Sequence, residues 1–214
     1  MDVMTQFVEM LDDRQRNTFL KLDSPPQIQA YLDSIPYSAD IANRSPLSVL
    51  RDNKAHCLDG GLFAAAALRH IGYPPIVIDM LPEAGRDDDH VLAIFKRHGY
   101  WGSVAKSNFT GLRYREPVYR TFRELVLSYF DDFFNAEGEK TMRAYSVPLY
   151  LKTLDKINWM WDEKATDFIE KHFGTLRRHL LLTPEMIRDL SPMDERSLKV
   201  GMLGVDLAGL YKPH

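Results

Sequence analysis

Apolar residues follow one another without interruption from Gly60 to Leu68. A segment that is apolar on every side is typical of a helix buried at the centre of a domain. Gly72 suits the left-handed cap of such a helix, and Pro74-Pro75 forbid its continuation. The pattern therefore predicts a central helix that begins near Cys57.

Strand-like patterns follow this helix. Ile76-Val77-Ile78 is a short β-branched run, and Asp89 to Phe95 has the length and composition of a strand. His98-Gly99 suits a tight turn, because Gly99 tolerates positive φ, and Tyr100 to Ala105 would return as a second strand. Together these segments predict a helix followed by a strand and a hairpin.

His90 lies at the start of the first hairpin strand. Because side chains alternate along a strand, it is expected on the same face as Leu92 and Ile94. A two-residue turn at His98-Gly99 would place His90 opposite Ser107, with Ala105 as its diagonal neighbour.

Most other segments have helical patterns. Helices are predicted at Val3–Leu11, after Ser24-Pro25-Pro26, after Ser45, at Thr121–Phe134, at Asn158–Phe173, and after Thr183 and Ser191. Tyr37 to Arg44 reads as a loop, and Met142 to Tyr150 as a strand. The C-terminal third is predicted to be helical and to close one side of a cleft.

Cys57 is the only cysteine of the chain. At a helix start, a thiol faces unpaired backbone N–H groups, and the positive end of the helix dipole favours the thiolate. The alternative is an inert, small buried side chain, since free cysteine is among the most buried residue types. The presence of a histidine further along the chain, His90, favours the interpretation of Cys57 as a nucleophile.

At these positions the chain resembles the transglutaminase-like superfamily. The resemblance rests on short motifs between about Gln27 and Asp132, namely Ala55-His56-Cys57-Leu58-Asp59-Gly60-Gly61, Gly72-Tyr73-Pro74-Pro75, Asp89-His90-Val91 and Gly99-Tyr100-Trp101. Within that superfamily it looks like a little-characterised bacterial branch. The resemblance implies an α+β, papain-like core, in which a buried helix carries Cys57 as nucleophile and a small antiparallel sheet carries His90 as base, with extra helices at both ends.

One position departs from the superfamily pattern. The acidic third member is expected four residues after the tryptophan, where this chain has Ala105. That group only orients the imidazole, and an amide serves in papain-like enzymes, so Asn108 or Ser107 would suffice. The other interpretation is that the activity has been lost.

Substrate-binding candidates lie just after the hairpin. Arg113 and Arg115 have the guanidinium geometry that holds a carboxylate or phosphate, although exposed, salt-bridged arginines are the simpler interpretation. Trp101 is assigned to substrate binding as part of its motif.

Composition and charge bear on the domain organisation, the partners and the cofactors of the protein. The 214 residues, 45% of them hydrophobic, suit one domain over 1–214, with a core at about 27–132 and a helical extension at about 150–214. The net charge of -3 favours neither nucleic acid nor an anionic membrane as a partner. No metal or nucleotide motif occurs, so no cofactor is expected. The chain has a single cysteine, which must stay reduced to react, and its first residues show no signal-peptide pattern. Both observations predict a cytoplasmic protein.

The sequence thus predicts thiol-dependent acyl transfer or amide hydrolysis on a peptide or protein substrate. The alternative is a catalytically silent domain of the same fold that binds a peptide or partner protein. The substrate, the balance between hydrolysis and transfer, and the oligomeric state are left open.

Overall fold

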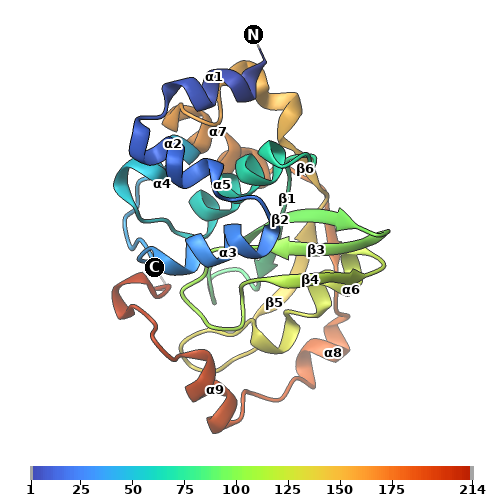
Figure 1. Cartoon of the computed structure of the whole chain (residues 1–214). Coiled ribbons are helices and arrows are strands. Elements are labelled where there is room, and N and C mark those ends of the chain that lie inside the picture. Colours follow the sequence, from blue (N-terminus) through green and yellow to red (C-terminus); the bar gives the residue numbers. More distant parts are fainter. Residues whose placement is uncertain (1, 213–214) are drawn as a thin grey trace.

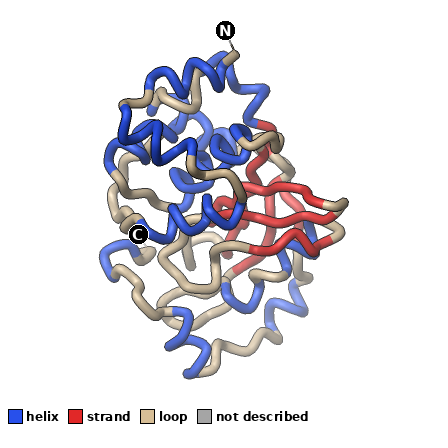
Figure 2. The backbone as a smooth tube through the Cα atoms, viewed as in Figure 1, coloured by secondary structure: helices blue, strands red, loops and turns tan. Residues whose placement is uncertain are grey.

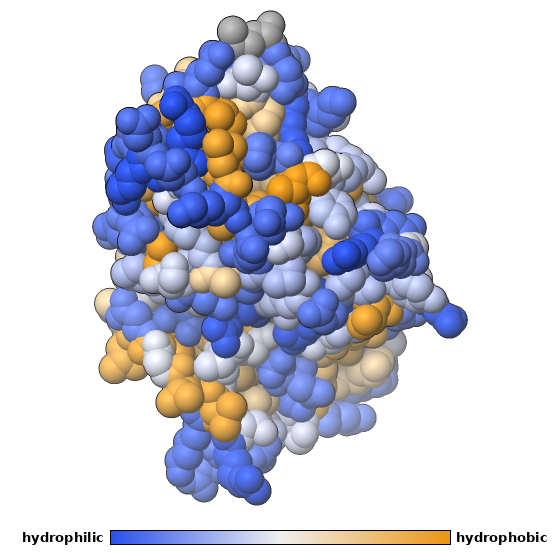
Figure 3. Space-filling view, viewed as in Figure 1, coloured by the Kyte–Doolittle hydropathy of each residue, from blue (hydrophilic) through white to orange (hydrophobic). Residues whose placement is uncertain are grey.

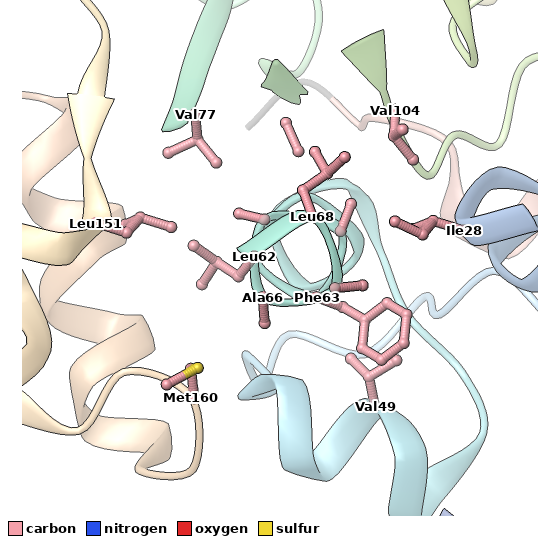
Figure 4. Close-up of a cluster of buried hydrophobic side chains, with 14 of the residues drawn as sticks. Ile28, Val49, Leu62, Phe63, Ala66, Leu68, Val77, Val104, Leu151 and Met160 are labelled. Carbon is pink, nitrogen blue, oxygen red and sulfur yellow. The ribbon is translucent and has the colours of Figure 1, made fainter. Parts of the chain in front are cut away.

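The central helix predicted from the apolar run is α5 (Cys57–His70), and all its residues from Cys57 to Leu68 are buried. The computed structural model describes residues 2–212. The helix ends as predicted, because Gly72 follows it with φ of 94°. Figure 4 looks along α5, whose side chains are enclosed by residues of other elements, among them Ile28, Val49, Val77, Val104 and Leu151.

Four helices before α5 and one near the end of the chain build this enclosure: α1 (Val3–Met10), α2 (Asp13–Leu20), α3 (Pro25–Ser34), α4 (Pro46–Asp52) and α7 (Glu163–Phe173). Their contributions to the α5 cluster include Phe7, Phe19, Ile28, Val49 and Ile169, all 0% exposed. Burying one such side chain contributes roughly 1.5–3 kcal/mol. The cluster therefore holds the first turn of α5, and Cys57 with it, on a rigid support.

An antiparallel sheet lies against α5. Its order is β4-β3-β2-β1-β5-β7, and β6 also pairs with β1. The strands are β1 (Ile76–Pro82), β2 (His90–Arg97), β3 (Tyr100–Val104), β4 (Arg115–Tyr119), β5 (Met142–Ser146), β6 (Leu149–Tyr150) and β7 (Arg178–Leu180). Helices lie above and below the sheet (Figures 1 and 2), so the predicted α+β class is confirmed.

The two faces of β2 belong to different clusters. Val91, Ala93 and Phe95 pack with α5. Leu92 and Ile94 pack on the opposite face, in a second cluster that includes residues of α6 (Phe122–Leu127). The predicted hairpin turn is confirmed, because Arg97 pairs with Tyr100 and Ala93 with Val104.

Several predicted boundaries were wrong. The helix expected over 121–134 ends at Leu127, where Ser128 Oγ donates to the Leu125 carbonyl at 2.6 Å. The strand expected over 142–150 is two strands, β5 and β6, separated by Val147 and Pro148. The helix expected from Asn158 begins at Glu163, because Asn158 is left-handed with φ of 59°.

The C-terminal part is not helical throughout. β7 pairs with β5, so part of the predicted helical extension belongs to the sheet. After β7 the chain continues through α8 (Pro184–Arg188), α9 (Glu195–Gly201) and the 3₁₀ turn η3 (Leu207–Gly209). Figure 1 shows this red segment returning toward α3. Within residues 2–212, no helix has the length and apolar character needed to cross a membrane.

Candidate functional site

Cys57 is the first residue of α5, and its side chain is buried, with 8% exposed. The residue before it caps the helix, since His56 Nδ1 accepts from the Leu58 N–H at 3.2 Å. Asp59 completes a reciprocal cap by accepting from the His56 N–H at 3.3 Å. The position of Cys57 at a helix start, predicted from sequence, is therefore fixed by its two neighbours.

Behind this cap lies a buried ionic network that the sequence analysis did not predict. Asp59 is fully buried and accepts from the Arg44 N–H at 2.6 Å. The Arg44 guanidinium also bonds to Asp40 and Asp52. Burial raises the pKa of Asp59 to about 7, although the N–H groups of Arg44 and His56 oppose the shift. The network fastens the loop at 37–44 to the first turn of α5.

His90 is the first residue of β2 and is 4% exposed. Its Nε2 lies 2.8 Å from the main-chain carbonyl oxygen of Leu112. A carbonyl only accepts, so Nε2 carries the proton and Nδ1 keeps its lone pair in the neutral ring. Burial lowers the pKa of His90 to about 4, so the imidazole is neutral at pH 7.

Cys57 and His90 line the same small cavity, with a volume of about 40 Å³. The thiol nevertheless donates elsewhere, to the main-chain carbonyl of Asp89 at 3.7 Å. Burial raises the pKa of the thiol well above its ordinary value, and Asp89 and Asp88 add to the shift. The expected thiolate is therefore not the resting form, because desolvation and carboxylates outweigh the helix terminus.

A larger cleft of about 650 Å³ opens beside Cys57. Its volume lies in the range of small-ligand sites. The lining residues come from five parts of the chain, within 37–43, 56–58, 88–91, 170–173 and 208–212. The cleft wall is acidic, and desolvation followed by Asp88 and Glu170 raises the pKa of Asp89 to about 7.

Tyr37 lines both the small cavity and the larger cleft. Burial raises the pKa of its hydroxyl, and the charges of Cys57 and Asp88 add to this. The backbone N–H of Cys57 acts in the opposite direction and lowers the pKa of that hydroxyl. Tyr37 was predicted only as part of a loop, and a single tyrosine there gives no sequence signal.

The side chains of the two residues proposed from sequence as third member form no hydrogen bond with His90, although both residues line the cavity that His90 lines. Asn108 bonds to the main chain of Asp206, and Ser107 Oγ accepts from the Phe109 N–H at 3.0 Å. Ala105, at the superfamily's acid position, has its main chain bonded to Gln29. The group that orients the imidazole is the Leu112 carbonyl, which no side-chain motif reveals.

The predicted substrate-binding residues lie apart from the small cavity. Arg115 pairs with Asp132 at 3.0 Å and lies over the Tyr129 ring. Trp101 packs on Phe122, with the two ring centroids 4.5 Å apart. Arg113 pairs with Asp33 and lines a neighbouring cleft of about 380 Å³.

Asn53 is the left-handed C-cap of α4, with φ of 53°, and turns the chain before α5. Among residues 2–212, no group of three or more His, Cys, Asp or Glu side chains is arranged to hold a metal ion.

Comparison with known proteins gives a distant likeness in structure only. No protein-family model matches the chain, and no curated protein sequence matches it. Among solved structures, it is similar to LapG of Legionella pneumophila, with a TM-score of 0.35 and 13% identity over 49% of this chain and 68% of that one. The calcium-bound form of LapG gives a TM-score of 0.36 and 14% identity, over 50% and 72% of the two chains. At this distance the likeness assigns neither a family nor an activity.

Proposed function

We propose that the chain is a thiol-dependent enzyme of transglutaminase-like, papain-like fold that transfers or hydrolyses acyl groups of peptide or protein substrates. The observation that carries the proposal is the common cavity of Cys57 and His90, with His90 Nε2 bonded to the Leu112 carbonyl. This arrangement leaves the Nδ1 lone pair free to take a proton. An oriented base beside a buried nucleophile is the minimal requirement for thioester chemistry.

The resting pair is neutral, so the first step moves a proton. As Cys57 Sγ attacks the acyl carbon, the thiol proton passes to His90 Nδ1 and the carbonyl π electrons move to oxygen. The imidazolium then gives that proton to the departing amine, and the thioester remains on Sγ. Water or a second amine, deprotonated by His90, attacks the thioester and returns the thiol.

The tetrahedral oxyanion needs two donors. The Cys57 backbone N–H supplies one, and we assign the other to the Tyr37 hydroxyl, which lies against that N–H. Burial keeps the hydroxyl protonated, because it raises the pKa of Tyr37. Tyr37 therefore remains a donor at neutral pH.

The Leu112 carbonyl would replace the acid or amide of related sites. It fixes the Nε2–H tautomer of His90, which is the task of a third member. A carbonyl carries only a partial charge, so it stabilises the imidazolium less than a carboxylate does. We expect a slow enzyme for this reason. A reduced thiol is required, which suits the cytoplasm.

One observation favours the second candidate, a catalytically silent binding domain. The thiol is protonated and bonded to the Asp89 carbonyl, and a segment of the chain itself lines the cleft. Such a domain would keep the cleft but would not form a thioester.

Acylation by a small activated ester separates the two candidates. With p-nitrophenyl acetate, an enzyme should carry an acetyl group on Cys57, seen by intact-mass spectrometry, and His90→Gln should slow acylation about 100-fold. His98→Asn is the matched control, since His98 is exposed in the hairpin turn with φ of 52°, a conformation that Asn tolerates. Equal acylation rates in all three chains, or none, would favour the silent domain.

A further inference from the structure

A segment near the end of the chain forms part of the wall of the cleft beside Cys57. The segment is Asp206–Lys212, which follows α9, and its residues Ala208–Lys212 line the cleft together with Cys57, Asp88 and Asp89. Gly209 and Tyr211 also line the small cavity of Cys57 and His90.

Asn108 holds this segment by its main chain. The Asn108 Nδ2 donates to the Asp206 carbonyl at 2.8 Å, and the Asp206 N–H donates to Asn108 Oδ1, also at 2.8 Å. A side-chain amide that bonds both polar groups of one residue holds polypeptide without regard to its side chain. The two residues are 98 positions apart, so this is tertiary recognition rather than a local turn.

Gly209 fits closely against Tyr37. A Cβ atom at Gly209 would lie 2.8 Å from Cδ1 and 2.9 Å from Cε1 of Tyr37, and 3.2 Å from Nδ2 of Asn108. Real Cβ atoms do not approach a ring carbon this closely, so the contact requires a residue without a side chain. Gly209 therefore packs against both Tyr37, the proposed oxyanion donor, and Asn108, which holds the segment.

The apolar side chains of the segment differ in burial. Leu207 is 70% exposed, whereas Leu210 and Tyr211 are half-buried and line the cleft. Figure 3 shows apolar surface at the lower left, where the red C-terminal part lies in Figure 1. Two hydrogen bonds from Asn108 and the contact of Gly209 with Tyr37 hold one end of the segment, and so small a set of contacts suits it to being displaced.

We infer that Asp206–Lys212 is an internal ligand that closes the cleft over Cys57, and that Asn108 and Tyr37 form a main-chain clamp for whichever polypeptide occupies it. The inference rests on the proposed function only in taking this cleft as the substrate site. In the closed state the segment competes with outside polypeptides. A partner that draws it away would open the thiol.

The test displaces the segment by a single side chain. Gly209→Phe should expel it from Tyr37 and raise the rate of Cys57 alkylation by iodoacetamide about tenfold, because the thiol reacts in the open form. Leu207→Phe is the matched control, since it adds the same side chain at an exposed position of the same segment. Circular dichroism checks that both variants fold, and Asn108→Ala provides an independent displacement should Gly209→Phe not fold.

Binding in trans tests the clamp directly. A fluorescein-labelled peptide with the sequence of residues 203–212 should bind the Gly209→Phe chain by anisotropy, and bind the parent chain at least tenfold more weakly because its own segment competes. Adding Asn108→Asp should abolish binding, since a carboxylate cannot donate to the peptide carbonyl. Folded variants with parental alkylation rates and no peptide binding would overturn the inference.

These measurements need no catalysis. Peptide binding to a Cys57→Ser, Gly209→Phe chain, combined with no acylation of the thiol in the opened Gly209→Phe chain, would uphold the internal ligand and reject the enzyme. Acylation of Cys57 without peptide binding to any variant would do the reverse. The two proposals therefore fail separately.

Discussion

His90 and Leu112, 22 residues apart, are joined by a 2.8 Å hydrogen bond between the imidazole Nε2 and a main-chain carbonyl. The bond selects the tautomer of the ring and leaves Nδ1 as the acceptor. A main-chain orienting group survives mutation of its own side chain. Substitutions at Ser107 and Asn108 should accordingly leave the tautomer of His90 unchanged.

The low pKa of His90 should make stability depend on acid. The folded-state pKa is about 4 and the model-peptide value is 6.5, so the unfolded chain binds a proton more readily between these values. The contribution is full above pH 6.5 and falls by up to about 3 kcal/mol as the pH drops to 4. Urea unfolding of the parent chain and of His90→Gln at pH 7 and pH 4.5 isolates this loss, because glutamine does not titrate. Parallel losses in both chains would mean that the pKa of His90 is ordinary.

The reactivity of the Cys57 thiol should depend on pH in the alkaline range. Burial and neighbouring carboxylates raise the pKa of Cys57 well above 9.0. The rate constant for iodoacetamide alkylation should therefore still be rising at pH 9, whereas an ordinary thiol is half ionised near ~8.5. N-acetylcysteine, measured in the same buffers, is the reference. A plateau below pH 8 would instead indicate a resting thiolate–imidazolium pair.

The features predicted correctly from the sequence are those in which the pattern of side chains determines the local backbone conformation. The apolar run predicted α5, and His98-Gly99 predicted the turn and the register of β2 with β3. The start of α5 near Cys57 followed from the position of the apolar run, which begins at Gly60. These features depend on residues close together in the chain, where propensity and periodicity act.

The features that were missed depend on contacts distant in sequence. The Leu112 carbonyl at His90 is a main-chain group, so its identity leaves no trace in composition. The raised pKa of Cys57 comes from burial, and acids that the fold brings to the helix terminus add to it, against the local effect of the dipole. The return of Asp206 to Asn108 crosses the whole C-terminal half of the chain. Local patterns predict none of these.

Two glycines in the first turn of α5 should tolerate no side chain. A Cβ atom at Gly60 would overlap the Cβ of Lys106, and one at Gly61 would lie 2.7 Å from Val91 Cγ1. Helix propensity alone would make Gly60→Ala stabilising by about 1 kcal/mol. We expect destabilisation by about 2 kcal/mol instead, because the close packing must give way. A double-mutant cycle with Lys106→Gly, read by urea unfolding, should recover at least half of that loss; additive effects would place the strain elsewhere.

The arginines at 44 and 51 offer a matched pair for the ionic network behind Cys57. Both pair with Asp52, but the side chain of Arg44 is 8% exposed and that of Arg51 is 57% exposed. Removing Arg44 leaves the fully buried Asp59 without its cationic partner, and breaking a buried pair typically costs about 3–5 kcal/mol. Removing Arg51 breaks solvent-screened pairs, each worth at most about 1 kcal/mol.

Arg44→Ala should therefore lower the free energy of unfolding by about 3 kcal/mol, and Arg51→Ala by less than about 1 kcal/mol. Asp59→Asn in the Arg44→Ala background should restore part of the loss, because it removes the orphaned charge and keeps an oxygen for the N–H of residue 44. At pH 8, above the pKa of about 7 that Asp59 has in the parent chain, urea unfolding measures the parent with that carboxyl ionised. Losing Arg44 raises the pKa of Asp59 further, so the loss in Arg44→Ala includes the cost of protonating the carboxyl. Equal losses in the two alanine variants would show that the network contributes no more than surface charge, and that α5 holds Cys57 in place by packing alone.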